Sequence, residues 1–516
     1  MANTKTIARN TGWYGLENIL NFVVGLTTSI AIARTLGPQK MWYLIYVSWL
    51  AQVISSLGGM GVPATTRKYM AEFLGRGDKG TARYIYLRTM RLQAGLAALI
   101  TAGLVIWVLG DAPPEYKLAA VLIVIGVWPR MVNSISAQAN VAAEELFANL
   151  PASAISICVF GLAVLATVLF HGGIIGFSIS IFLMGFVDFL VRIIPTMKRI
   201  TAWSTTHVQP EGLSERMFSF AWQSVITMIA SLIVWDRSEF FLLKHLCPDK
   251  SQLSYYSVAF NMAERLLITS TVFGSAAGAT IFAQYGRDKS KLPELTAVSL
   301  RYLALTSIPL HVIAAALAFP ALLLLYGNQY RGAAMVATLA PLLCMPKAFT
   351  APVQSLLQSM ERQSYVIWAT VLAGIVDVGV AWYFIPAHGA VGACFGNGAA
   401  QVAALGIMWA GAIYLCKVKL PWMQITKITF ASGLASLAAY FIAARLAPLW
   451  GILLGGIASL IVLFGLIYLM RVLEPEDRDR FKILAAMLPR RIAGPVNAIL
   501  MRMIPLELGS ISPNDV

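Results

Sequence analysis

Apolar segments of about 20 residues recur along the whole 516-residue chain, and shorter polar segments separate them. Such segments are long enough to cross the roughly 30 Å hydrocarbon core of a membrane as helices. We place about fourteen of them, centred near residues 23, 51, 99, 127, 160, 184, 228, 267, 311, 345, 374, 402, 434 and 460. The pattern therefore predicts an all-α integral membrane protein.

Short sequence signatures recur about 210 residues apart, which indicates that one unit has been duplicated. The segment Ala33–Pro38 follows a long apolar segment, and Leu243–Pro248 follows another. Farther along, Gly173–Gly176 has a counterpart in Gly389–Gly392. Membrane carriers made of paired halves usually hold the substrate between the halves and rock them around it. Transport is therefore the leading interpretation.

The order of the spans predicts a domain organisation. Residues 1–200 form an N-lobe with spans one to six, and residues 215–416 form a C-lobe with spans seven to twelve. A polar cytoplasmic linker, 201–214, joins the lobes. Two extra helices follow within 417–473, and the tail 474–516 is expected to be an amphipathic helix on the cytoplasmic membrane surface.

Charge refines the picture. Only 12% of the residues are charged, roughly half of what soluble proteins carry. The net charge of +15 comes from basic residues in alternating loops, which indicates membrane orientation rather than nucleic-acid binding. We expect the cytoplasmic (inner) membrane, with both termini cytoplasmic. The basic stretch Pro63–Lys79 is expected to be a second helix on the membrane surface.

The chain offers little for catalysis. Its five cysteines are scattered and lack disulfide or metal spacing. A Gly-rich phosphate loop is absent from the sequence, so no ATPase is built in. We expect a transporter rather than an enzyme, with no catalytic residues, no metal and no cofactor.

Several ionisable residues fall inside the expected spans, where each would cost about 2.5–3.5 kcal/mol at a lipid-facing helix centre. We expect most of them to pair with one another or to line a hydrated cavity. They are Glu17, Arg130, Asp188, Asp236, Arg237, Glu239, Glu264, Arg265, Lys347 and Asp377.

Polar side chains in the first span follow the helical period. Glu17, Asn21 and Thr28 share one face, and the seventh span carries a similar stripe. Two interpretations are open. The stripes line a cavity, or they hydrogen-bond neighbouring helices to one another.

Three segments together resemble a known family. They are Ala33–Pro38, then Trp235–Arg237 with Tyr255–Ala259, and finally Ile385–Ala393. Their order and spacing cover about residues 10–410 and resemble the polysaccharide transporter, or O-antigen flippase, family of the multidrug/oligosaccharidyl-lipid/polysaccharide exporter superfamily. The resemblance implies two six-helix lobes around a central cavity and flipping of a lipid-linked oligosaccharide. The chain departs from the pattern at Asp377, where such proteins often carry Asn.

A polyprenyl-diphosphate-linked oligosaccharide needs fixed cations for its phosphates, and polar and aromatic groups for its sugars. The candidate diphosphate contacts are Arg130, Arg237, Arg265 and Lys347, with internal salt bridges as the rival role. Further cavity candidates are Asn21, Trp235 and Asp236. The candidates for coupling to H⁺ or Na⁺ are Glu17, Glu264 and Asp377. Asp188 and Arg192, four residues apart, are expected to form a local ion pair.

The sequence thus predicts a flippase that moves a lipid-linked oligosaccharide by alternating access for polysaccharide, O-antigen or exopolysaccharide biosynthesis. Polysaccharide assembly proteins and membrane lipid are the other expected partners. Two alternatives stay open. A cation-coupled multidrug exporter of the same superfamily would favour acids over cations in its cavity, and a membrane glycan polymerase would be expected to carry a large polar loop or catalytic domain.

Overall fold

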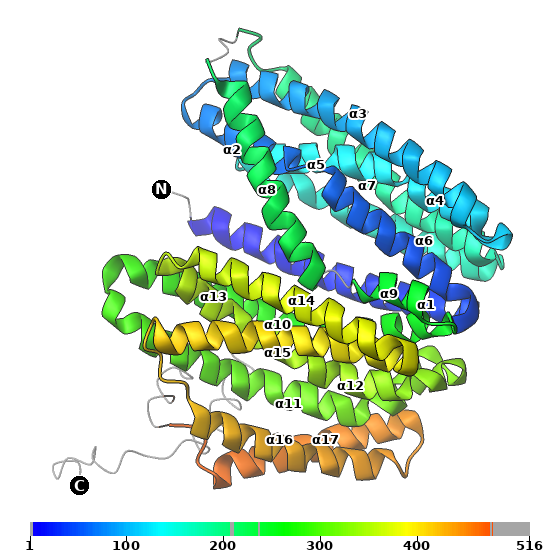
Figure 1. Cartoon of the computed structure of the whole chain (residues 1–516), viewed down its shortest axis with the longest axis vertical. Helices are drawn as coiled ribbons and strands as arrows, with labels where there is room; N and C mark the ends of the chain where they lie inside the picture. The colour runs from blue at the N-terminus through cyan, green and yellow to red at the C-terminus, as the bar shows by residue number, and fades with distance from the viewer. Residues whose placement is uncertain (1–3, 207–210, 236–237, 475–476, 478–516) are drawn as a thin grey trace. The chain divides into compact units, whose positions relative to one another are not determined.

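The computed structural model describes residues 4–206, 211–235, 238–474 and Asp477. Every regular element in this part of the chain is a helix (Figure 1). The first are α1 (Thr4–Gly58), α2 (Val62–Gly75), α3 (Lys79–Asp111), α4 (Lys117–Ile125), α5 (Val127–Ala142), α6 (Leu150–Leu169), α7 (Gly173–Thr201), α8 (Leu213–Trp235) and α9 (Glu239–Leu246). They are followed by α10 (Ser251–Arg287), α11 (Leu292–Tyr326), α12 (Ala334–Cys344), α13 (Thr350–Ser359), α14 (Gln363–His388), α15 (Ala390–Tyr414), α16 (Trp422–Ala443) and α17 (Pro448–Leu469). Short 3₁₀ helices are η1 (Pro114–Tyr116), η2 (Leu146–Asn149), η3 (Lys289–Lys291), η4 (Asn328–Ala333) and η5 (Met345–Phe349).

Within the described residues, 12 helical segments are long and apolar enough to cross a membrane. The first of them, Leu20–Gly58, contains a kink and covers the first two expected spans. Helices α8 and α9 lie where the seventh span was expected. The predicted all-α membrane fold with about fourteen spans is therefore confirmed.

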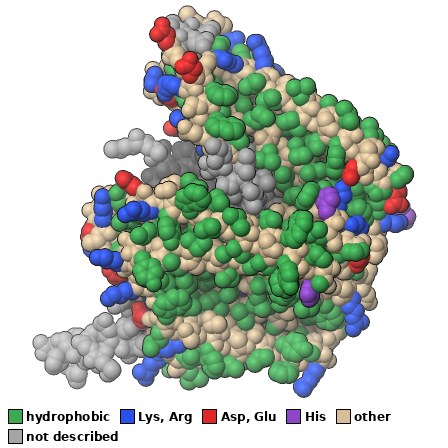
Figure 2. All heavy atoms as spheres, in the orientation of Figure 1, with side chains coloured by type: hydrophobic (Ala, Val, Ile, Leu, Met, Phe, Trp, Pro, Cys, Tyr) green, Lys and Arg blue, Asp and Glu red, His purple; other side chains and the backbone are tan. Residues whose placement is uncertain are grey.

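The helix surfaces suit a lipid environment. Leu99 on α3 and Ile106, about two turns later, are more than 70% exposed, and Leu162 on α6 is 67% exposed. Figure 2 shows hydrophobic side chains along the lengths of the helices, with Lys and Arg gathered mainly near the edges of the face drawn. Large apolar side chains left outside are costly in water but cost nothing in hydrocarbon.

The segment Ala33–Pro38 is a corner in the chain. Gly37 has φ 69° and interrupts the helical geometry of α1, and Pro38 has no N–H to continue the hydrogen-bond ladder. Arg34 Nε donates to the carbonyl oxygen of Leu325 (2.8 Å), and Ser254 Oγ donates to that of Pro38 (2.8 Å). These two hydrogen bonds join the corner to residues that are distant in the sequence. The repeated segment Ala33–Pro38 therefore has a structural role.

The chain divides into two compact units. The first comprises Met1–Val258, Leu325–Ala333 and Thr370–Ala400, and the second comprises Ala259–Leu324, Ala334–Ala369 and Gln401–Val516. In the first unit, α6 packs against α1 and α7, and α5 packs against α2, α3 and α7. In the second unit, α16 and α17 form a closely packed pair (Figure 1). The expected division into an N-lobe and a C-lobe stays a prediction.

Helix α2 differs from the expected surface helix. Its apolar residues Tyr69, Met70 and Phe73 are at most 3% exposed, because α2 packs on α3 and α5. Its apolar stripe therefore faces protein rather than lipid. The turn after α2 ends at Asp78, whose carboxylate accepts from the backbone N–H of Thr81 (2.9 Å) and caps α3.

The start of the expected tail is held by an ion-pair cluster in the second unit. Arg301 on α11 is 6% exposed and pairs with Asp477 at 2.5 Å and with Glu474. Tyr302 also donates to Asp477. The amphipathic helix expected in the tail otherwise lies outside the described residues.

Candidate substrate-binding site

A polar pocket lies among four helices of the first unit. It encloses about 220 Å³ and is lined by Asn21 of α1, Arg130 of α5, Ser153, Ser156 and Ile157 of α6, and Met184, Gly185, Asp188 and Arg192 of α7. Gly185 borders open space, because a Cβ built at this position would meet no atom within 4 Å. Two of the sequence candidates, Asn21 and Arg130, are thus brought to one site.

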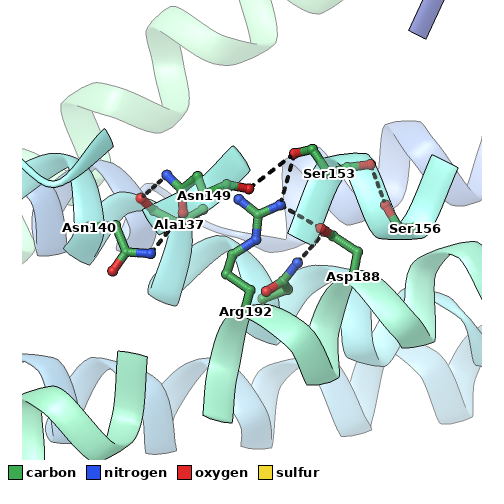
Figure 3. Close-up of polar contacts among 8 residues, drawn as sticks. Ala137, Asn140, Asn149, Ser153, Ser156, Asp188 and Arg192 are labelled. Atoms are coloured by element: carbon green, nitrogen blue, oxygen red, sulfur yellow. Dashed lines mark hydrogen bonds and ion pairs between the residues drawn. The ribbon is translucent and has the colours of Figure 1, made fainter. Parts of the chain in front are cut away.

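The expected Asp188–Arg192 ion pair is confirmed. The two side chains stand one turn apart on α7 and are joined at 2.5 Å, with Arg192 only 10% exposed. Figure 3 shows this pair and the groups around it. Asn133 of α5 donates to the second carboxylate oxygen of Asp188, and Arg192 reaches Ser153 Oγ at 3.4 Å. The pair is therefore fixed to α5 and α6 by further hydrogen bonds.

A hydrogen-bonded chain extends from Ser153 towards α5 (Figure 3). Ser153 Oγ donates to the carbonyl oxygen of Asn149 (3.4 Å), and Asn149 accepts from the Asn140 side chain (2.8 Å) and donates to Ala137 O (3.2 Å). Arg199 donates to Asn140 at 2.7 Å. Because these groups satisfy one another, they position the wall of the pocket rather than offering free donors to a ligand.

Arg130 is the pocket cation whose charge no described carboxylate neutralises by an ion pair. It is half-buried and donates to Gln52 Oε1 at 2.9 Å, a neutral acceptor. Among the described residues it forms no ion pair within 4 Å, although Asp188 is near enough to interact electrostatically. Among the side chains that the structure describes, two guanidinium groups and one carboxylate line the pocket and give it a net positive charge. Such a pocket suits an anionic group of phosphate size, and its volume is too small for a whole oligosaccharide.

The remaining sequence candidates are distributed differently. Arg265 and Glu264 lie on α10 and Lys347 lies on η5, all in the second unit. Asp236 and Arg237 lie outside the described residues, and so do the side chains of Glu17 and Trp235. Their roles as substrate or coupling residues stay predictions.

A second cluster joins two acids in the first unit. Glu239, at the start of α9, is 0% exposed, and Asp377 of α14 is 1% exposed. Asp377, Asn397 and Tyr256 all face the Glu239 carboxylate. Ser238 Oγ donates to Asp377 Oδ2 at 3.2 Å. Two like charges in a buried site repel each other unless a cation or a proton lies between them.

The sequence indicated only half of this cluster. Asp377 was a coupling candidate, while Glu239 stood among the in-span charges without a role. Nothing in the sequence pairs the two, because they lie on helices far apart along the chain and no helical period relates them. The one available signal was that both charges interrupt apolar segments.

Solved structures share this fold. The chain resembles "Lipid II flippase MurJ, inward closed conformation" with a TM-score of 0.69 and 12% sequence identity, over 89% of this chain and 98% of that one. It also resembles the inward-facing conformation of a multidrug resistance MATE family transporter of the MOP superfamily, with a TM-score of 0.65 and 14% identity, over 77% and 95% of the two chains. A MOP superfamily transporter from Pyrococcus furiosus gives a TM-score of 0.52 at 15% identity, over 78% and 93%.

The molecule is therefore an integral membrane protein with the fold of the MOP superfamily transporters. A sequence model of the family described as "Polysaccharide biosynthesis protein" matches residues 31–335, more than half of the chain. The chain belongs to this family, and the family resemblance in its sequence is confirmed. No curated protein matches the sequence.

Proposed function

We propose that the protein is a flippase for a lipid-linked oligosaccharide. It binds a polyprenyl-diphosphate-linked glycan at the cytoplasmic leaflet of the cytoplasmic membrane and releases it at the outer leaflet by alternating access. The product feeds polysaccharide, O-antigen or exopolysaccharide assembly, with assembly proteins as partners. No bond is made or broken in this cycle, so the protein acts as a transporter rather than an enzyme.

The observation that carries the proposal is a cationic pocket inside a membrane protein of a polysaccharide biosynthesis family. An arginine inside a membrane protein is costly unless a partner, a ligand or water compensates for its charge. Arg192 has Asp188 as its partner at 2.5 Å, whereas Arg130 contacts the neutral Gln52. We therefore assign Arg130 as the main phosphate contact, with Arg192 and Asn21 beside it in the pocket.

The buried Glu239–Asp377 cluster supports the proposed coupling of transport to an ion. Glu239 and Asp377 are buried side by side, with Asn397 and Tyr256 facing them. Carboxylate, amide and hydroxyl oxygens are suitable ligands for a hard cation, and carboxylates are suitable proton carriers. In the proposed cycle, H⁺ or Na⁺ at this cluster drives the conformational exchange.

The proposal is tested in cells by locating the intermediate. Without the protein, a lipid-linked oligosaccharide should accumulate facing the cytoplasm, with its glycan complete. Arg130→Gln should reproduce this accumulation while the variant still inserts into the membrane. Undecorated lipid carrier in place of the precursor would instead support a glycan polymerase. Normal export by Arg130→Gln would remove Arg130 from the site.

A cation-coupled multidrug exporter is the second candidate. The buried Glu239–Asp377 pair favours it, because acids inside a transporter can bind cationic drugs. The net positive pocket around Arg130 favours an anionic substrate instead. Drug susceptibility of cells that overproduce the protein separates the two. Raised resistance that depends on Glu239 and Asp377 would support the exporter, and unchanged susceptibility supports the flippase.

A further inference from the structure

A long groove in the first unit lies apart from the polar pocket. It encloses about 720 Å³ between α1, α2, α3 and α8, and its walls are almost entirely apolar. Leu92 of α3 is 52% exposed, and Phe218 and Trp222 of α8 are 76% and 60% exposed. Helix α8 packs against α2, which places one wall of the groove (Figure 1). The volume lies in the range of small-ligand sites.

Among the described residues, one charged side chain lines this groove. Arg88 of α3 lies at one end, where Nη1 donates to Ser214 Oγ of α8 (2.9 Å) and Tyr84 Oη (3.3 Å). Within the described part of the chain, Arg88 contacts these hydroxyls and the Tyr84 ring but no carboxylate. The guanidinium therefore offers a positive charge without a carboxylate partner, beside the hydroxyl groups of Ser214 and Tyr84, at one end of the apolar groove.

The helices that form the groove carry further basic residues. Arg67 and Lys68 lie on α2, Arg216 lies on α8, and Arg91 lies about one turn from Arg88 on α3 itself. Glu72 engages Arg216 and Arg76, at 3.2 and 2.6 Å, and so leaves the charge of Arg88 unopposed. Clusters of this kind attract anionic lipids at the cytoplasmic leaflet, the side to which we assign this end of α3.

We propose that the groove binds one anionic glycerophospholipid. Its phosphodiester lies on Arg88 and Ser214, and one acyl chain lies between α3 and α8, along Leu92 and Leu96. The wall from Arg88 to Leu96 spans eight residues of α3, which is about 12 Å. The lipid is thus a ligand of the protein, distinct from the transported substrate, and its site does not depend on the proposed flippase activity.

The number of cations favours a phosphodiester over the diphosphate of the substrate. A diphosphate carries at least two negative charges and is best held by several fixed cations. Within the described part of the chain, this groove supplies one lining cation, and the hydroxyl of Ser214 completes a site for a singly charged group. A lipid bound here contacts both α3 and α8 and therefore links the N-terminal helices to the helix after the linker.

The test measures lipid binding to the full-length protein after delipidation in detergent. Native mass spectrometry with phosphatidylglycerol should detect one tightly bound lipid, and Arg88→Gln should weaken this binding about tenfold or more. Arg91→Gln is the matched control, since Arg91 lies on the same helix but outside the groove lining, and it should retain near-normal affinity. Equal losses in the two variants would overturn the site.

A second variant and two other lipids complete the test. Leu92→Trp fills the groove at an exposed position and should weaken lipid binding while circular dichroism and elution volume stay unchanged. Normal binding by Leu92→Trp would overturn the placement of the acyl chain. Phosphatidylcholine should bind more weakly than phosphatidylglycerol, and equal binding would contradict an anion site. Tighter, Arg88-dependent binding of a polyprenyl diphosphate would reassign the groove to the substrate and overturn the proposal.

Discussion

The ammonium group of Lys244 lies 2.5 Å from the carboxylate of Asp111 and joins α9 to the end of α3. The same ammonium lies 4.5 Å from the centre of the Tyr46 ring and 5.2 Å from that of Trp107. The Lys244 side chain is only 11% exposed, so water compensates little of its charge. One ion pair and two aromatic faces therefore hold α9 against α1 and α3 in the first unit.

We expect this pair to contribute measurably to stability. Lys244→Gln or Asp111→Asn leaves the other charge without its partner, and each should lower the free energy of unfolding by about 1–3 kcal/mol. The double variant should lose less than the sum of the two single losses. Thermal unfolding in detergent measures all four proteins as a double-mutant cycle. Fully additive losses would contradict a direct interaction.

The acid pair should control coupling. Glu239→Gln and Asp377→Asn keep the shape of each side chain but remove its charge, so the imposed H⁺ or Na⁺ gradient should lose its effect on transport. We expect at least about a fivefold loss of gradient-driven transport in reconstituted vesicles. Glu294→Gln, at an exposed carboxylate on α11, is the control. A normal gradient dependence in both core variants would exclude this pair as the coupling site.

Gly61 marks a close approach between the α1–α2 turn and α8. Its φ is +70°, and a Cβ added there would lie 2.3 Å from the Ala221 carbonyl oxygen. Gly77 has a similar φ of +78° but open space around it. Gly77→Ala should therefore cost about 1–2 kcal/mol for the left-handed backbone alone. Gly61→Ala should cost about 1–3 kcal/mol more, because the helices must also move apart.

Unfolding of the two alanine variants by heat or denaturant separates these contributions. The two variants are comparable because both glycines have a positive φ and lie in the short turns that flank α2, Gly61 before it and Gly77 after it. Equal losses of stability would mean that α8 does not pack on Gly61 as described.

Asp249 should give part of the stability a dependence on pH. It precedes α10 and accepts from the backbone and side chain of Ser251 (3.0 and 2.7 Å) and from Gln252 (3.0 Å). Partial burial opposes ionisation, but these hydrogen bonds prevail and hold the pKa of Asp249 below its ordinary value of 3.8. A lowered folded-state pKa contributes stability above the unfolded-state value, and this contribution disappears as the pH falls through the folded-state pKa.

The stability difference between wild type and Asp249→Asn should therefore be largest at neutral pH and shrink below about pH 4. Melting temperatures of both proteins from pH 7 downward measure it. Ser251→Ala removes one donor and should give a smaller difference of the same sign. A difference that grows as the pH falls would contradict the assignment.

Much of the fold could be predicted from the sequence, because membrane spans are set by apolar length. The kink at Gly37 and the Asp188–Arg192 pair were also within reach, since both depend on residues close together in the chain. Helix α2 was only half predicted. Its stripe of Tyr69, Met70 and Phe73 indicated an amphipathic helix, but the same stripe fits lipid and protein equally well.

Contacts between helices could not be predicted from the sequence. Asn133 reaches Asp188 across 55 residues of sequence, and Glu239 meets Asp377 across a longer stretch. A helical period relates positions within one helix and gives no distance to the next helix. The sequence named Asn21 and Arg130 among several candidates for one cavity, but the pocket that these two share with Arg192 is seen only in the structure.

The flippase proposal is tested most directly by reconstitution. The purified protein is placed in vesicles with a fluorescent polyprenyl-diphosphate oligosaccharide on the inner leaflet, and an added glycan-cleaving enzyme reports arrival at the outer leaflet. Wild type and Arg91→Gln should expose the glycan, while Arg130→Gln should not. The absence of protein-dependent exposure in wild-type vesicles would contradict the account.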